Sequence, residues 1–454
     1  MRGRPAIGAT LLRGGKLAAL SLLAMAFVWV HALLATNPGY FSHDEFQWAA
    51  HAQQHGWLET LRTSLADLSA FQYRPLTFTL WTALSALLFD SPMAMHALWI
   101  LLGLGNAAML ATVLRRFDVA AWPAALAAMA FALSPYAVYV HGWVATLGDL
   151  LWVGLALSMV LAICSRSASL QSGPRLAGLA AALTTLALLS KEAAVAIPAL
   201  LCVGWWIDRR PRWGWALAGA ATVTTLYLIL RLEVILFDTP AASGYGWSLL
   251  RVPQRFVQYH LFTWYPWSFE VHQLMQWHPR RHLIIAAIML ACYLLAFRGT
   301  AAIVRMAAIS AAALGPVLIL DSAANQYGYA FAAVLVGALA LAWPRTSRSG
   351  RAAIVVLGIL STWHGVDVAR GVARAGSLQR EFSPSLAAAV HALPDGAQLV
   401  LHPKCASDHW VYSRLTHQIP LYRGIPIGDR VILHEQQVDG GREIACDGSI
   451  RDER

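Results

Sequence analysis

The feature that most constrains this chain is a series of apolar runs, each about as long as a helix that crosses a bilayer. Such a helix needs about 20 apolar residues, and fewer where it is buried inside a bundle. Hydrophobic residues make up 58% of the 454 residues and charged residues only 13%, well below soluble domains. We therefore predict an all-α polytopic membrane protein. The predicted spans are 17–36, 95–114, 120–140, 146–165, 174–190, 192–207, 213–234, 283–297, 302–320, 327–343 and 351–369.

Arginine clusters between the runs predict which side each loop faces, because basic residues accumulate in cytoplasmic loops. The arginine clusters all lie on the same side of the membrane only if the apolar run 75–89 does not cross it. We interpret this run as a juxtamembrane or re-entrant helix inside one long outer loop, 37–94. About eleven spans result, with the N-terminus inside and the C-terminus outside the cytoplasmic membrane. The net charge of +10 then reports topology, and nucleic acid is not an expected partner.

The last part of the chain differs in character from the apolar runs. It is predicted to form a helix, a turn at 394–396 and an alternating strand, as in a small extracytoplasmic α+β appendage. Cys405 and Cys446 fall there and could pair if the segment faces an oxidising compartment. The other cysteines are predicted to be small core residues: Cys164, Cys202 and Cys292. The predicted units are a membrane domain, 1–374, with outer loops 37–94 and 235–282, and the appendage, 375–454.

Two adjacent carboxylates, Asp44 and Glu45, follow the first apolar run in the stretch YFSHDEFQWAAHA. Charge beside a bilayer is costly unless it is hydrated or has a task. Adjacent residues point in different directions, so a matched acid–base pair is not expected. One carboxylate is a candidate for chemistry, while the other binds an ion, a base or a backbone group. An equally weighted alternative is that Asp44 only caps the helix predicted over 46–52.

Two cations on the predicted outer side are candidates for binding an anion. Tyr73 and Arg74 precede Pro75, which is predicted to start a helix. A guanidinium there can clamp a phosphate with two hydrogen bonds, or it can anchor a lipid headgroup. Lys191 and Glu192 lie in LLSKE, at the tip of a predicted helical hairpin, where the preceding serine is predicted to cap the next helix.

Other polar residues are predicted on the same side. Asp149 stands about one turn into an apolar helix, where an unpaired aspartate is costly, and this position favours a functional role. His141 and the segment 325–327 give weaker signals. The loop 235–282 is rich in aromatic and basic residues, which suit sugar rings and phosphate or, alternatively, form an interfacial belt.

In their order along the chain, these motifs resemble the GT-C membrane glycosyltransferases. The motifs are DE in the first outer loop, YRPL before an apolar helix, a histidine followed by DLL entering a span, and LLSKE before an apolar helix with proline. The likeness covers roughly 17–345. It is greatest toward transmembrane O-mannosyltransferases that carry tetratricopeptide repeats. It extends more distantly to protein O-mannosyltransferases and the lipid A aminoarabinose transferase.

The resemblance implies inverting transfer of a sugar from a polyprenyl-phosphate donor to a hydroxyl of a glycan, lipid or protein outside the cytoplasmic membrane. It implies Asp44 as general base and Arg74 and Lys191 as ligands of the donor phosphate. Glu45 is counted beside Asp44 among the candidate catalytic residues. The expected supporting residues are Tyr73, His141, Asp149, Glu192 and Tyr327. No cofactor is expected, and two scattered carboxylates, Glu45 and Asp149, are thin support for a divalent metal.

The chain also departs from the pattern of those transferases. Relatives often carry an arginine just before the aspartate that Asp149 matches, whereas this chain has 146-Thr-Leu-Gly-148. They carry an Arg-Tyr pair where this chain has Gln326 and Tyr327, and no tetratricopeptide repeats follow the last span. The first two differences put a standard donor site in doubt, and the third puts a protein acceptor in doubt.

Two other functional classes stay open. A transporter or flippase for a lipid-linked intermediate would place charges near mid-helix and would often show repeated halves. Here the charges are predicted at outer helix ends, and no repeat is visible in the sequence. A non-catalytic assembly or sensor protein would keep its function when Asp44 is replaced by asparagine.

Overall fold

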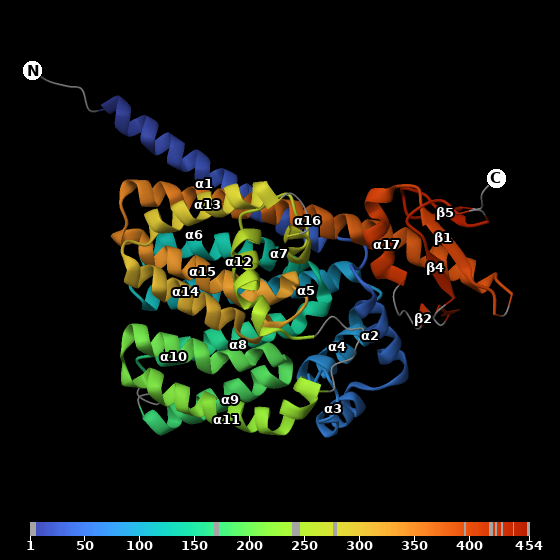
Figure 1. The fold of residues 1–454 in the computed structure, drawn as a ribbon, viewed down its shortest axis with the longest axis horizontal. Helices are drawn as coiled ribbons and strands as arrows, with labels where there is room; N and C mark the ends of the chain where they lie inside the picture. Colours follow the sequence, from blue (N-terminus) through green and yellow to red (C-terminus); the bar gives the residue numbers. More distant parts are fainter. Residues whose placement is uncertain are drawn as a thin grey trace, which may run out of the picture.

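The computed structural model describes residues 6–167, 172–237, 246–275, 279–394, 396–416, 421–422, 425–427, 430–438 and 440–451. Over these residues the chain is mainly helical, with a small sheet near its C-terminus (Figure 1). The α-helices are α1 (Ala6–Ala35), α2 (His43–Gln54), α3 (Trp57–Ala66), α4 (Pro75–Leu88), α5 (Pro92–Arg116), α6 (Ala121–Ala132), α7 (Pro135–Gly142), α8 (Leu147–Ile163), α9 (Gly173–Ser190), α10 (Ile197–Asp208), α11 (Pro211–Phe237), α12 (Val252–Phe262), α13 (Pro279–Ala296), α14 (Thr300–Leu314), α15 (Tyr329–Ala342), α16 (Arg348–His391) and α17 (His409–Thr416). Three 3-10 helices matter below: η1 (Val144–Thr146), η3 (Glu192–Ala196) and η7 (Asn325–Gly328).

Among the described residues, seven helical stretches are long and apolar enough to cross a membrane, and the bent pair α6–α7 would make eight. This result confirms the predicted multi-pass membrane class. Each predicted span coincides with helical structure, but those assigned to 17–36, 192–207 and 283–297 fall on α1, α10 and α13, outside the eight. The finer number of eleven spans therefore stays a prediction.

The predicted span 120–140 is interrupted in the structure. Helix α6 ends at Ala132 and α7 begins at Pro135, with a bend of 60° between them. The Ser134 side chain accepts a hydrogen bond from the amide of Ala137 and so caps α7. A proline in the first turn has no amide hydrogen to continue the ladder of the preceding helix. The bend therefore has a local cause in the sequence.

The core is centred on α7, of which every residue is buried. This short helix contacts α1, α5, α15 and α16, and it lies in the middle of the bundle in Figure 1. A helix that is apolar all round is expected at such a position, because no side of it meets solvent.

The segment 37–94, which the sequence predicts as an outer loop, contains α2, α3 and α4, and these helices lie at the same end of the long axis as the C-terminal sheet (Figure 1). Helix α4 has 14 residues, about 21 Å at 1.5 Å per residue, against about 30 Å for the hydrocarbon core. Pro75 lies in its first turn, as the sequence predicts. The length of α4 agrees with a juxtamembrane helix.

The C-terminal sheet follows α16, a helix of 44 residues that runs from the membrane bundle into the appendage. The predicted boundary at 375 therefore falls inside a continuous helix. Strand β1 pairs in parallel with β4 and β5, and β6 closes the sheet antiparallel to β5. The strands are β1 (Leu399–Pro403), β2 (Leu421–Tyr422), β3 (Ile425–Pro426), β4 (Val431–Leu433), β5 (Arg442–Ile444) and β6 (Ile450–Arg451).

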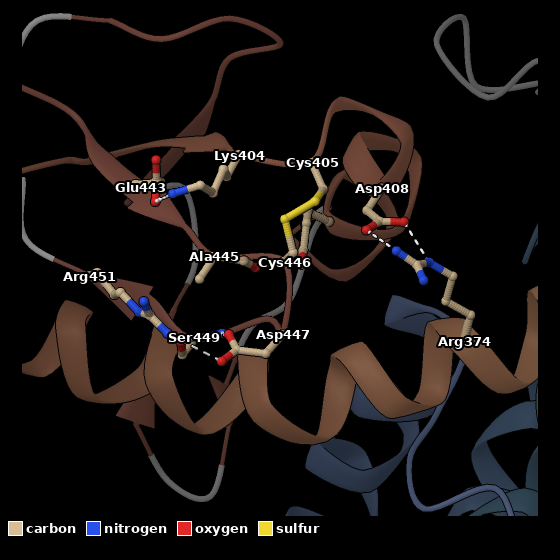
Figure 2. Close-up of a disulfide and its surroundings, with 11 residues drawn as sticks. Arg374, Lys404, Cys405, Asp408, Glu443, Ala445, Cys446, Asp447, Ser449 and Arg451 are labelled. Atoms are coloured by element: carbon tan, nitrogen blue, oxygen red, sulfur yellow. Dashed lines mark hydrogen bonds and ion pairs between the residues drawn. A yellow bond between two sulfur atoms is a disulfide. The ribbon is translucent and has the colours of Figure 1, made fainter.

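The structure confirms the small α+β segment and pairs its two cysteines. The disulfide Cys405–Cys446 joins the segment after β1 to the turn after β5 (Figure 2). This bond is consistent with an extracytoplasmic appendage. Asp395, the middle residue of the predicted turn, lies outside the described residues. Of the free cysteines, Cys202 is exposed on α10 rather than in the core as predicted.

Candidate functional site

The backbone that leads to Asp44 is fixed from two sides. The amide of Tyr40 donates to the Gln379 side chain of α16 at 2.7 Å, and His96 of α5 contacts the carbonyl of Gly39 at 2.9 Å. A Cβ atom on Gly39 would lie 2.2 Å from the carbonyl oxygen of Gly376, so only glycine allows α16 to approach this closely. The two helices therefore determine where α2 starts.

A capping box starts α2 and separates the roles of the two adjacent carboxylates. The Ser42 side chain accepts from the amide of Asp44, and the Glu45 side chain accepts from the amides of Phe41 and Ser42 at 3.4 and 3.1 Å. The cap is thus Ser42 with Glu45, and not Asp44 as in the alternative interpretation. Glu45 takes the backbone-binding role that the sequence left open between the two carboxylates.

Burial differs between the two carboxylates as well. Glu45 is buried, and desolvation together with the charge of Asp44 raises its pKa to about 8. The Asp44 side chain remains 31% exposed. One of its oxygens accepts from the Ser42 hydroxyl at 3.0 Å, and the other lies 3.7 Å from the His43 ring. Asp44 is therefore the more accessible of the two carboxylates.

A cation from the C-terminal segment lies beside these carboxylates. Arg414 of α17 forms an ion pair with Glu270 at 2.7 Å and contacts the Tyr139 hydroxyl at 3.4 Å. Its guanidinium stacks over the rings of Phe41 and Trp143, 4.5 and 5.4 Å from their centres. Burial disfavours the charge of Arg414, but its neighbours outweigh this and raise its pKa above the usual value.

Asp44 and Glu45 are among the neighbours that raise the pKa of Arg414, after Tyr139 and Glu270. We call the group Asp44, Glu45, Glu270 and Arg414 the acidic cluster. The sequence analysis missed Glu270 and Arg414. They are 144 positions apart, and only the docking of α17 onto the bundle brings them together.

A second group, the paired cluster, contains Arg74, Asp149, Lys191 and Glu192. The Nε atom of Arg74 donates to Glu192 at 2.7 Å, and the ammonium of Lys191 makes a short ion pair with Asp149. Asp149 and Lys191 are almost fully buried, whereas Arg74 and Glu192 are about one fifth exposed. Two cations balance two carboxylates, so the paired cluster has no net charge.

The tip of the α9–α10 hairpin brings the paired cluster together. Lys191 follows the last residue of α9, and its ammonium lies 5.3 Å from the centre of the Tyr327 ring in η7. Ser190 does not cap the next helix as predicted, because its hydroxyl donates to the carbonyl of Leu186 within α9. A Cβ atom on Gly148 would lie 2.7 Å from the carbonyl oxygen of Ser190. This close approach leaves no room for a side chain just before the aspartate of α8.

Helix α4 joins the two clusters. Its first end carries Arg74, and the Thr77 hydroxyl donates to the carbonyl of Ser190 at 2.7 Å, beside Lys191. One turn further along α4, the Trp81 ring lies 5.0 Å from that of Trp48 in α2. The Trp81 indole in turn donates to the carbonyl of Val144 in η1 at 2.8 Å. The predicted juxtamembrane helix therefore holds both groups of charges at one end of the bundle.

Two predicted supporting residues lie elsewhere. His141 is fully buried in α7, where it contacts the Tyr329 hydroxyl at 3.3 Å and the His31 ring at 5.7 Å. It lies in the bundle interior, next to the last residue of α7 and before η1 and α8. Tyr73 donates to the carbonyl of Leu65, and the guanidinium of Arg231 covers its ring at 5.2 Å. Tyr73 thus braces the loop before Arg74.

The described part of the loop 235–282 mostly serves packing. Residues 238–245 and 276–278 lie outside the described residues. Arg255 donates to the carbonyls of Leu320 and Asp321, and Arg251 pairs with the Asp321 carboxylate at 3.1 Å. Trp264 is buried, and Trp267 is 64% exposed. The contacts of Arg251 and Arg255 are therefore with other parts of the chain, and packing explains them.

The chemistry open to this end of the bundle follows from these contacts. The acidic cluster offers an accessible carboxylate that can accept a proton, beside a fixed guanidinium. The paired cluster offers a guanidinium and an ammonium, the two side chains that best bind phosphate. Within the described ranges, no group of three His, Cys, Asp or Glu side chains is placed to hold a metal ion.

Comparisons with known proteins add no family to these observations. No protein-family model, no curated protein and no solved structure matches the chain. The likeness to the GT-C transferases stays a prediction from the motifs, and the chemistry rests on this chain's own residues.

Proposed function

We propose that this protein is an inverting glycosyltransferase of the outer face of the cytoplasmic membrane. Its donor is a sugar linked to a polyprenyl phosphate, and its acceptor is a hydroxyl of a glycan, lipid or protein. The acceptor oxygen bonds to the anomeric carbon as the bond from that carbon to the phosphate oxygen breaks. The acceptor proton goes to Asp44, and the polyprenyl phosphate leaves as an anion. Because this leaving group is already a stable anion, a single base suffices.

The observation that supports the proposal is the difference in surroundings between Asp44 and Glu45. Glu45 is occupied by the capping box, whereas Asp44 is partly exposed and hydrogen-bonded through Ser42. A general base must be both reachable and oriented. Asp44 meets both conditions on α2, which lies at the same end of the molecule as the C-terminal sheet (Figure 1).

Arg74 and Lys191 are proposed as the ligands of the donor phosphate. In the structure each is balanced by a carboxylate, so a phosphate would join them as an additional partner. An ammonium has three donors, and Asp149 takes one of those on Lys191. Cations at this position stabilise the charge that develops on the phosphate as the sugar leaves.

The test is transfer of label from radiolabelled polyprenyl-phosphate sugars in membranes that contain the wild type or Asp44→Asn. Loss of a general base should lower the rate by roughly a hundredfold or more. Glu59→Gln is the matched control, because Glu59 is an exposed carboxylate in the same outer loop. We expect this control to transfer within about twofold of the wild type.

Equal transfer by the wild type and Asp44→Asn, at equal expression, would remove Asp44 from the site. If the wild type instead moves labelled donor across vesicle membranes without transferring its sugar, the protein is a flippase. In that case the transferase proposal is wrong.

A further inference from the structure

The C-terminal segment covers the residues 40–46, which lead into α2 and include Asp44; we call this stretch the Asp44 loop. The Trp410 ring of α17 lies 6.1 Å from that of Phe41, and the Tyr422 ring of β2 lies 5.7 Å from that of Phe46 in α2. Phe41 is fully buried. The residues before and after Asp44 are thus enclosed by a segment that lies more than 350 positions further along the chain.

Arg414 is the charged member of this contact. It stacks on Phe41, three residues before Asp44, and on Trp143, which precedes η1. Its Nη1 atom is paired with Glu270, but its Nε atom is buried without a hydrogen-bond partner in the described part of the chain. Burial of an arginine whose N–H donors are not all hydrogen-bonded costs free energy, so such a residue is a poor choice if it only fills space. An apolar side chain of similar volume would serve packing better, so the charge itself is the feature that needs a role.

Helix α17 is rigidly held at its other end. The buried Asp408, just before α17, receives two hydrogen bonds from Arg374 of α16, at 2.7 and 2.5 Å (Figure 2). Three residues earlier, Cys405 is tied to Cys446. Arg414 therefore extends from a short helix that α16 and the disulfide fix in place.

We propose that the C-terminal disulfide segment is part of the Asp44 site, with Arg414 as the positioning residue that holds the Asp44 loop in its reactive placement. The expected effect of Arg414 on sugar transfer rests on the proposed function. The coupling of Arg414 to the loop does not depend on that function. Arg414 acts through Phe41 and Trp143 and is not assigned a contact with the substrate.

Two substitutions separate charge from geometry. Arg414→Gln removes the cation, and Arg414→Lys keeps the charge but loses the planar group that stacks and pairs with Glu270. The matched control is Lys404→Gln, which removes a cation from the same segment, where Lys404 pairs with Glu443 at the surface (Figure 2).

The first measurement follows the accessibility of the Asp44 loop and does not depend on sugar transfer. A cysteine is placed at position 43 by His43→Cys, the three unpaired native cysteines are replaced by alanine, and a membrane-impermeant maleimide is added to the full-length protein in nanodiscs. If Arg414 holds the loop, Arg414→Gln should raise the labelling rate at least fivefold, because the loop opens more often. Arg414→Lys should raise it less, and Lys404→Gln should leave it unchanged.

The second measurement is transfer of sugar label by the same Arg414 and Lys404 variants without the added cysteine. We expect Arg414→Gln to lower kcat at least tenfold while KM for the donor stays within threefold. Arg414→Lys should recover part of kcat. A general loss of folding would instead lower the amount of active protein by the same factor for every donor. Arg414→Lys would then not restore activity.

Wild-type labelling rates in Arg414→Gln would overturn the proposal, whatever the transfer assay gives. Faster labelling with unchanged kcat would also overturn it, because the loop would then move without consequence for the site. If the wild type transfers no donor, the proposed function fails, and the labelling rates still decide whether Arg414 holds the loop.

Discussion

The acidic cluster and the paired cluster start from the same sequence pattern and end in different environments. Each contains two adjacent charged residues, Asp44–Glu45 in one and Lys191–Glu192 in the other. In both, one residue is buried and its neighbour is partly exposed. Adjacent residues point in different directions, so an exposed charge beside a buried one follows from local geometry.

The two clusters differ in the partner of the buried residue, which is Glu45 in one and Lys191 in the other. Glu45 is met by backbone amides of its own loop, whereas Lys191 is met by a carboxylate from another helix, Asp149. The first arrangement is local and needs no partner charge. The second depends on two buried charges that must be kept together. We therefore expect the Asp149–Lys191 pair to be more sensitive to the loss of one charge than the Asp44–Glu45 pair.

The largest expected effect comes from separating the buried ion pair. Asp149→Leu leaves Lys191 buried without its carboxylate and should cost about 3–5 kcal/mol of stability. The double variant Asp149→Leu with Lys191→Met should regain most of this loss, because no buried charge remains. The measurement is the thermal unfolding midpoint of the purified protein in detergent.

The matched variant in the acidic cluster is Asp44→Leu, for which we expect a loss below about 1 kcal/mol, as for a partly exposed charge. Equal losses for Asp44→Leu and Asp149→Leu would break the comparison. If the double variant is stable but inactive in sugar transfer, Lys191 has a task beyond structure.

An intermediate effect is expected from the pH dependence of Glu45. Its pKa is about 8 in the folded protein, against an ordinary value of 4.5. The stability that protonated Glu45 contributes is therefore fully present below about pH 4.5 and is lost as the pH rises to about 8. Between pH 5 and pH 8 the loss is on the order of 3 kcal/mol.

Glu45→Gln should remove this pH dependence, because the amide keeps one acceptor for the capping box and cannot ionise. Unfolding midpoints of the wild type and Glu45→Gln are measured from pH 5 to pH 8, with Glu59→Gln as the exposed control. The wild type and the control should fall together with rising pH, while Glu45→Gln stays flatter. Parallel curves for all three would show that Glu45 ionises normally.

The contrast between the clusters also shows which part of the site the sequence could predict. Period, apolar length and the position of Pro75 predicted the helices and the short α4, because these depend on neighbouring residues. The adjacent pair Asp44–Glu45 predicted separate roles for the two carboxylates, with an ion, a base or a backbone group as the partner of one of them, and the structure shows the backbone group. Asp149 was expected to need a partner because of its apolar surroundings, and the structure supplies Lys191.

The residues that sequence reasoning missed depend on contacts between distant segments. Arg414 meets Phe41 only because α16 continues past the predicted boundary at 375 and carries the appendage onto α2. His141 was predicted among the polar residues of the outer side but is buried near the end of α7. The contact of Arg414 requires the three-dimensional course of a long helix, and the burial of His141 requires the packing of α1, α5, α15 and α16 around α7.

The smallest expected effect tests whether the local arrangement of the acidic cluster is needed at all. The Ser42 hydroxyl accepts from the amide of Asp44 and donates to its carboxylate at 3.0 Å. Ser42→Ala removes both contacts and should cost about 1 kcal/mol of stability, while Ser42→Thr keeps them. If Ser42 only caps α2, sugar transfer by Ser42→Ala should match the wild type below the unfolding midpoint. If it also orients Asp44, transfer should fall several-fold at temperatures where the protein is fully folded, and Ser42→Thr should restore it. The second result is the one we expect, because a carboxylate that turns freely is in position to accept the proton for only part of the time.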